Sequence, residues 1–441
     1  MDFELQFGGR GAPGRRRPAG EARRILVLGD FAGRGARGDG AAREPLATRP
    51  IVVVTQESDG LDAAIRTLSP SISVAGVAQT LEMSALDDFH PDRLFRRLSV
   101  FHEPPRAATP AAVSDGDLAR LLGKRPAAAP APAASAIDGL IGQIVAGHVV
   151  SAPVDAPLDA AALGRILRAV LHEPAFQALE ARWRALDLLA SRAEESVEIA
   201  LLDVTRAELV ADRASALAKR VLSPPGGRPF AALIGDFAFG PGAEDTALLS
   251  QLGALAAAAR APFIAGAAPA LVGCPSLAGA GDPAQWEAPS PEDARRWQVL
   301  RQAPAAAWIG LALPRFLARA PYGVKTNAIE AFAFDEIEGR PAPAALCWAS
   351  GAFLCALALA RGEETDDANE IDDLPFFSFR ADGDLEMYPS TEVFWGQRAA
   401  DAVLSRGLMP LLSARDRNAV RLVRLQSIAD PPRALGGDDA T

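Results

Sequence analysis

The sequence has few of the residues on which disulfide, redox and metal chemistry depend. Only three of its 441 residues are cysteines, and only four are histidines. The three cysteines (Cys274, Cys347 and Cys355) are too scattered for a disulfide framework and suit a reducing compartment, where they are buried as small apolar side chains. The histidines lie in separate segments without the close spacing of zinc ligands. We therefore expect no cofactor and no metal.

Basic charge and long apolar runs are also lacking. The net charge is −10, from 45 basic and 55 acidic residues, which does not suit binding to nucleic acid or anionic membrane, because both need a basic face. No apolar run reaches the roughly 20 residues of a membrane-spanning helix. The first residues, MDFELQFGGRG, lack the pattern of a secretory signal. We expect a cytoplasmic protein that neither binds nucleic acid nor inserts into a membrane.

Apolar residues are plentiful, and they divide the chain into three parts. They make up 49% of the sequence, enough for a large core and for two or three domains. Residues 107–156 are rich in proline and alanine, which predicts a linker. Residues 1–106 and 157–441 alternate strand-like apolar runs with helical patterns, which predicts an α/β fold. We expect a small N-terminal α/β unit packed on a larger mixed one.

Local patterns place several elements. Strands are predicted at Arg24–Gly29, in RPIVVVTQES, in VEIALLDVT and in PFAALIGDFAFG. Helices are predicted in GLDAAIRTLSP, in a hairpin interrupted at Pro174, and from Pro91. Asp87 and Asp88 precede Pro91, where a carboxylate would cap that helix. The acidic run 363–373 lacks the central glycine of a calcium loop and is interpreted as a solvated loop.

One stretch raises the question of a phosphate site. In RILVLGDFAGRGARGDG, a predicted strand leads into Gly33, Gly35 and Gly38, the spacing of a dinucleotide-binding loop. Such a site needs a helix after the glycines, whereas the next residues contain Pro45 and Pro50 without apolar periodicity. We interpret the stretch as a strand entering a flexible loop, and a nucleotide-binding enzyme remains an alternative. The Gly-Asp-Phe-Ala core of this stretch recurs in ALIGDFAFGPG.

Longer motifs resemble a known family. In residues 1–106, the motifs RILVLGDFAG, LSPSISVAG and LEMSALDDFHPDRLFRRL resemble the small subunit of the type VI secretion contractile sheath. In residues 157–441, five motifs resemble the large sheath subunit and follow its order: HEPAFQALEARWRALDLL, PFAALIGDFAFG, AAAARAPFIAGAAPALVG, WIGLALPRFLARAPYGVKTN and YPSTEVFWGQR. The resemblance implies a structural, non-enzymatic fusion of both subunits that works by protein–protein assembly.

The resemblance also implies partners and contains two departures. The implied partners are other sheath subunits, the inner tube protein, the baseplate and the AAA+ unfoldase that recycles contracted sheath. The family's large subunit continues well beyond LQS, whereas 14 residues follow Ser427 here, so we expect a C-terminally shortened large-subunit-like region. The acidic RGEETDDANEIDDLPFF replaces a G-W-C and Gly-rich stretch. These departures favour a second hypothesis, a sheath-like adaptor or regulator that does not polymerise.

Two contacts are predicted from apolar spacing near the N-terminus. Phe3, Leu5 and Phe7 alternate with polar residues, as in a half-buried strand. This strand either pairs with the sheet edge of a neighbouring copy or stays in its own domain. Leu94 and Leu98, with Phe95 beside them, give the helix from Pro91 an apolar face. We expect that face to pack between the small and large regions.

A third contact is predicted in the linker. In SAIDGLIGQIVAGH, one helical stripe consists of Ile137, Leu140, Ile141 and Ile144. The resemblance implies that this helix is recognised by the recycling unfoldase, because it lies just before the large-subunit-like region. The alternative is that the helix docks on its own domain, since an exposed apolar stripe is a liability.

Overall fold

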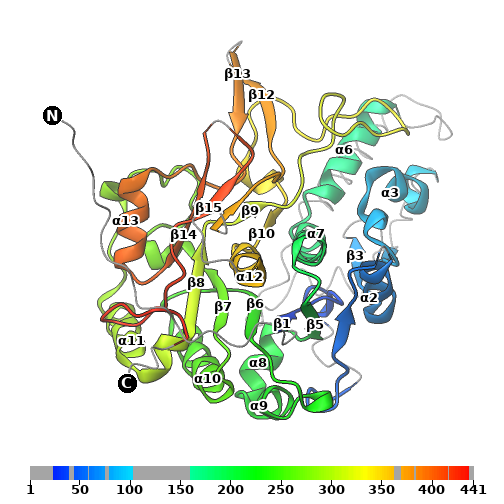
Figure 1. The fold of residues 1–441 in the computed structure, drawn as a ribbon. Helices are drawn as coiled ribbons and strands as arrows, with labels where there is room; N and C mark the ends of the chain where they lie inside the picture. Colours follow the sequence, from blue (N-terminus) through cyan, green and yellow to red (C-terminus); the bar gives the residue numbers. More distant parts are fainter. Residues whose placement is uncertain are drawn as a thin grey trace, which may run out of the picture.

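A computed structural model describes residues 23–38, 44–57, 59–74, 79–102, 159–361, 369–381, 384–415 and 417–436. Its centre is a nine-stranded sheet in the order β11-β15-β14-β8-β7-β6-β1-β5-β2, with helices on both faces (Figure 1). The predicted α/β fold is confirmed.

Six neighbouring strands of the sheet are parallel. They are β14 (Met409–Ser413), β8 (Ile309–Leu313), β7 (Phe263–Ala267), β6 (Ala232–Phe239), β1 (Arg23–Gly29) and β5 (Val197–Asp203). The edges are antiparallel: β2 (Val52–Val54) pairs with β5, and β15 (Val420–Leu422) joins β14 to β11 (Glu370–Ile371). Parallel strands are buried on both faces, which explains their nearly continuous apolar sequences.

Alternating side chains of the strands build two cores, one on each face. In β1, Ile25 and Val27 enter one core, while Leu26 and Leu28 enter the other. The first core is closed by α2 (Gly60–Leu68), α3 (Pro91–Arg97), α6 (Ala160–Leu171), α7 (Pro174–Arg192) and α12 (Ala352–Arg361). The second is closed by α8 (Arg206–Asp212), α9 (Ser215–Leu222), α10 (Ala243–Ala259), α11 (Pro291–Gln302) and α13 (Gln397–Ser405).

Strand β1 comes from the first predicted region but lies inside the sheet of the third. It pairs with β5 from Arg23↔Val197 to Gly29↔Asp203, and with β6 on its other edge. Residues 23–102 and 159–436 therefore share one sheet and both cores. The predicted linker connects two parts of the same core.

Three small sheets complete the described part. Strands β3 (Ser71–Val74) and β4 (Gln79–Glu82) form a hairpin, and β9 (Phe316–Leu317) pairs with β10 (Trp348–Ala349). The hairpin of β12 (Phe377–Ala381) and β13 (Asp384–Tyr388) projects from the body of the molecule (Figure 1).

Two local predictions are wrong in detail. The glycine loop after β1 contains a one-turn helix, α1 (Arg34–Arg37), because the Asp30 carboxylate accepts hydrogen bonds from its first amides. Helix α3 is capped by His90, whose Nδ1 accepts from the Asp92 amide, and not by a preceding carboxylate. The carboxylate of Asp88 instead accepts from the amides of Ser84 and Ala85.

Candidate functional site at the junction of the two regions

The two Gly-Asp-Phe-Ala segments lie side by side at the carboxyl ends of β1 and β6. Leu28 is in register with Gly235, so the first segment begins beside the second. A Cβ atom on Gly29 would lie only 3.2 Å from the Cβ of Asp236, so glycine permits this close approach. Arg182 of α7 joins the segments, because its guanidinium pairs with Asp236 and donates to the carbonyl of Asp30.

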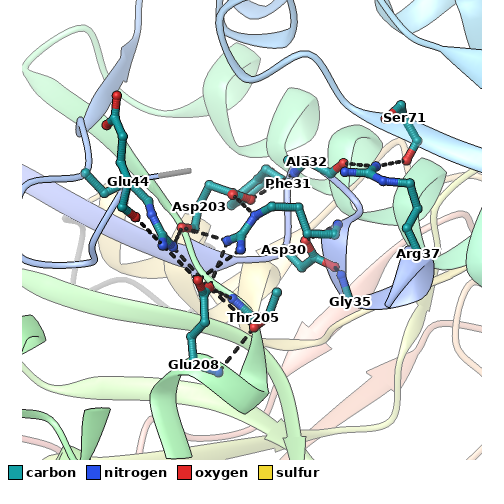
Figure 2. A network of polar contacts seen from close by, with 12 residues as sticks. Asp30, Phe31, Ala32, Gly35, Arg37, Glu44, Ser71, Asp203, Thr205 and Glu208 are labelled. Atoms are coloured by element: carbon teal, nitrogen blue, oxygen red, sulfur yellow. Dashed lines mark hydrogen bonds and ion pairs between the residues drawn. The ribbon is translucent and has the colours of Figure 1, made fainter. Parts of the chain in front are cut away.

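A buried ionic network lies next to these segments (Figure 2). The Arg34 guanidinium donates to Asp203 at 2.9 Å and to both carboxylate oxygens of Glu208 at 2.8–2.9 Å. Arg49 donates to the same Glu208 at 2.7 and 3.0 Å. Both arginines and Asp203 are at most 8% exposed. Because the arginines belong to the first region and the carboxylates to the third, the network ties the two regions together.

The position of Glu208 follows from a local helix signal. Glu208 is the third residue of α8, and it exchanges hydrogen bonds with Thr205 in a capping box. Burial alone would raise the pKa of Glu208, but hydrogen bonds from Arg34 and Arg49 hold that pKa well below its ordinary value. Sequence analysis missed this network, although the T-x-x-E spacing from Thr205 was a readable signal.

The glycine loop is built for chain packing. The amides of Arg34 and Gly35, which a phosphate would need, donate to the Asp30 carboxylate at 2.8 Å. Gly33 has a φ of +72°, and a Cβ there would lie 2.7 Å from the carbonyl oxygen of Ser71. The Asp30 carboxylate already accepts from these amides and would repel a phosphate group, so the geometry does not favour a nucleotide at this loop.

The cavity beside the loop has paired cations. It has a volume of about 500 Å³ and is lined by Gly33, Gly35, Arg182 and Arg206 among others. Arg182 pairs with Asp236, and Arg206 pairs with Asp245. The two arginines are therefore already neutralised by carboxylates of this chain.

Helix α3 and the residue after it, Leu98, carry the three side chains predicted to pack between the regions. Leu94 and Leu98 are fully buried in the core that includes side chains of α6 and α7. Phe95 is half-buried, and its ring centroid lies 5.5 Å from that of Phe332. The role of these residues in interdomain packing stays a prediction, which these contacts support.

Helix α3 also carries a carboxylate that sequence analysis missed. The side chain of Asp92 accepts hydrogen bonds from the backbone amides of Glu330 and Ala331 at 2.9–3.0 Å. Asp92 is only 8% exposed, so these charge-assisted bonds are shielded from water. No sequence signal indicated this contact, because its partners lie more than 230 residues away.

A second buried ionic cluster holds the segment after β9 against α7. Glu180, which is fully buried, accepts from Arg184 at 2.8 Å and Arg319 at 2.7 Å. Arg319 also donates to both oxygens of Glu336. His172, at the end of α6, lies 3.7 Å from Glu336. Burial lowers the pKa of His172 more than the neighbouring Glu336 raises it.

Other sequence predictions have different outcomes. The three cysteines are buried and free, as expected. Of the acidic run, only residues 369–373 are described, and Glu370 lies in the edge strand β11. The predicted contact residues Phe3, Leu5, Phe7, Ile137, Leu140, Ile141 and Ile144 lie outside the described residues.

Two kinds of feature are absent from the described part of the chain. No three His, Cys, Asp or Glu side chains converge there as metal ligands do. Among the helices in this part of the chain, none combines the length and apolar character needed to cross a bilayer.

Comparison with known proteins identifies the family. Residues 156–429 match the family model described as VipB: EvpB/VC_A0108, tail sheath N-terminal domain. The chain is also 30% identical over 290 residues to the type VI secretion system sheath protein TssC1 of Pseudomonas aeruginosa. That alignment covers 59% of this chain and 58% of the relative, so the chain spans little more than half of the relative's length. Because the family model matches more than half of the 441 residues, the chain belongs to the VipB tail sheath family.

Proposed function

We propose that this protein is a structural component of the type VI secretion contractile sheath, in which residues 1–106 serve as the small subunit and residues 157–441 as the large one. Family membership supports the large-subunit role. The small-subunit role rests on the sequence motifs of the first region. The protein acts in the cytoplasm by assembly with other sheath subunits, around the inner tube protein and next to the baseplate. Contracted assemblies are recycled by the AAA+ unfoldase.

The observation that carries this proposal is the position of β1. The family match begins at residue 156, so it includes seven strands of the nine-stranded sheet but neither β1 nor β2. Without β1, the edges of β5 and β6 would be unpaired and their apolar side chains uncovered. The domain matched by the family model therefore needs another segment to supply this strand and complete its sheet. Fusion keeps the two parts at a fixed ratio and a high effective concentration.

Co-expression of the two halves as separate chains tests the fusion. Residues 1–106 and 157–441 should co-purify as a 1:1 complex, and the larger half alone should be insoluble or bind hydrophobic dye. The matched variant Asp203→Asn in the larger half should weaken co-purification, because Asp203 binds Arg34 of the smaller half. The proposal is contradicted if the larger half folds alone and does not bind the smaller half.

A second candidate function is a sheath-like adaptor that does not polymerise. The observation favouring it is the acidic segment 363–373, which stands where the resembled family has a Gly-rich stretch. Electron microscopy of the purified full chain distinguishes the two functions. Tubes support the sheath component, whereas particles that bind ordinary sheath subunits without forming tubes support the adaptor. Titration with millimolar ATP tests the enzyme alternative, for which binding at the Gly33–Gly38 loop would be required.

A further inference from the structure

A groove lies between the start of α6 and residues 324–339, in the long loop after β9. Its volume is about 570 Å³. One wall carries Ala160, Ala161 and Gly164, and the other carries Val324, Phe334 and Ile337. Small residues on α6 leave room for another segment to approach its backbone closely. The groove is therefore a seat of mixed character, because Arg168, Asp335 and Glu338 line it together with these apolar residues.

The charged side chains that line this seat have partners, and Asp335 accepts a hydrogen bond from the Val324 amide. Arg168 pairs with Glu338 at 2.5 Å and donates to the carbonyl of Asp335. The same guanidinium stacks over the ring of Phe334. Val324, by contrast, is 65% exposed, which is unusual for a large apolar side chain. The groove thus combines paired charges with the exposed apolar side chain of Val324.

The described residues that flank the predicted linker lie near this groove. At one end, His102 bonds to the carbonyl of Phe95, whose ring contacts Phe332. The ring of Phe332 in turn contacts Phe334 in the groove wall. At the other end, Asp159 caps α6, and the next residue already lines the groove. The described chain therefore stops at His102 and resumes at Asp159 near the same surface.

We propose that residues 137–148 dock into this groove of their own chain. Their stripe of Ile137, Leu140, Ile141 and Ile144 would pack on Val324 and Ile337 of the groove walls, in the helix-in-groove mode. Asp138 is the only charged residue from 135 to 147, which suits a seat without free charges. The ten residues 149–158 span up to about 35 Å when extended, enough to return to the cap of α6. Gly139 and Gly142 disfavour an isolated helix, so we expect this segment to become helical only when it is docked in the groove.

Hydrogen exchange of the full-length chain, followed by mass spectrometry of peptides covering 134–150, tests the docking. These peptides should be protected in the parent protein. Val324→Glu and Ala161→Glu each place a charge on a groove wall and should reduce that protection by about tenfold or more, because a charge cannot be buried there unpaired. The matched control is Val299→Glu on α11, since Val299 is 71% exposed and lies in the other helix layer.

The outcomes are distinguishable. Ile141→Asp should lose the same protection as the groove variants, and all four proteins should keep the parental melting temperature. Peptides that exchange freely in the parent overturn the proposal, as does protection that neither groove variant lowers. Protection that disappears on dilution assigns the occupant to a second copy and also overturns docking within one chain. The test is independent of tube formation, so it stands whether or not the proposed sheath function fails.

Discussion

Replacing Asp203 with asparagine should separate the two regions. Asp203 accepts hydrogen bonds from the Ala32 amide and from the Arg34 guanidinium, both at 2.9 Å, and is 5% exposed. Asparagine keeps the size of the side chain but removes its charge. Its amide NH2 would also face either the Ala32 amide or Arg34, and both of these groups can only donate. Asp203→Asn therefore leaves a buried guanidinium with one carboxylate fewer.

The expected loss can be bounded. Removing one partner of a buried ion pair costs about 3–5 kcal/mol. Glu208 still neutralises Arg34 in the variant, so we expect a value near the lower end, about 3 kcal/mol. Whole proteins are stable by only about 5–15 kcal/mol, so this loss is readily measured. The double variant Arg34→Met/Asp203→Leu should lose less than the sum of the single variants, because no buried charge is left unpaired.

Urea unfolding gives the loss of stability, and linker cleavage assigns it to the junction. Trypsin can cut after Arg120 and Lys124 in the predicted linker, after which gel filtration in increasing urea shows whether the halves separate. The variant halves should separate at lower urea than the parent halves. Glu292→Gln is the control, since its exposed pair with Arg296 is worth at most about 0.5 kcal/mol. An Asp203→Asn protein as stable as this control would refute the reasoning.

Four further predictions concern other parts of the chain. Phe95→Asp should weaken the contact of α3 with Phe332 in the long loop after β9, so that the cleaved halves separate at a lower urea concentration. Halves that still elute together at the same urea concentrations as the parent halves would contradict this. Gly33→Ala should cost roughly 1–3 kcal/mol more than Gly38→Ala in urea unfolding, because both have a φ of +72° but only at Gly33 does a Cβ meet backbone, at 2.7 Å. In the folded protein the pKa of His172 lies below 6.5, so the stability that comes from keeping this imidazole neutral is complete above pH 6.5 and is lost as the pH falls below it. His172→Gln should therefore make the urea midpoint less dependent on pH between pH 7.5 and 5.5. A variant whose midpoint depends on pH as steeply as the parent's would show that His172 is not the group responsible. Deleting residues 2–8 should abolish assembly in electron micrographs but leave the melting temperature nearly unchanged, whereas a large drop would place the strand in its own domain.

Some elements of the fold could be read from the sequence because their signals are local. The strand at the start of the glycine stretch, predicted from Arg24, begins at Arg23 in the structure. The predicted interruption at Pro174 is where α7 begins, two residues after α6 and with proline in its first turn. Each of these signals depends on a few neighbouring residues, on apolar periodicity or on the fixed φ of proline.

Other features were misread locally. The loop after β1 was expected to have no helix, but Asp30 supplies the carboxylate that stabilises one turn. The cap of α3 was expected from a carboxylate, but the imidazole of His90 takes that position. In both cases several side chains could make the same kind of bond. Only the path of the backbone decides which of them reaches the amides.

The sequence by itself determined the α/β class, several of the strands and helices, and the resemblance to the sheath family. The tertiary structure alone decided that β1 lies between β5 and β6, and that Arg34 meets Asp203 and Glu208 about 170 residues away. The physical reason is that periodicity reports which faces of an element are buried but not what buries them. A strand that is apolar on both faces, such as β1, requires neighbours on both edges, and the sequence does not state whether they come from the same region. Those neighbours are β5 and β6, from residues 197–239. The boundary predicted at residue 106 therefore separates two parts of the sequence that share one core.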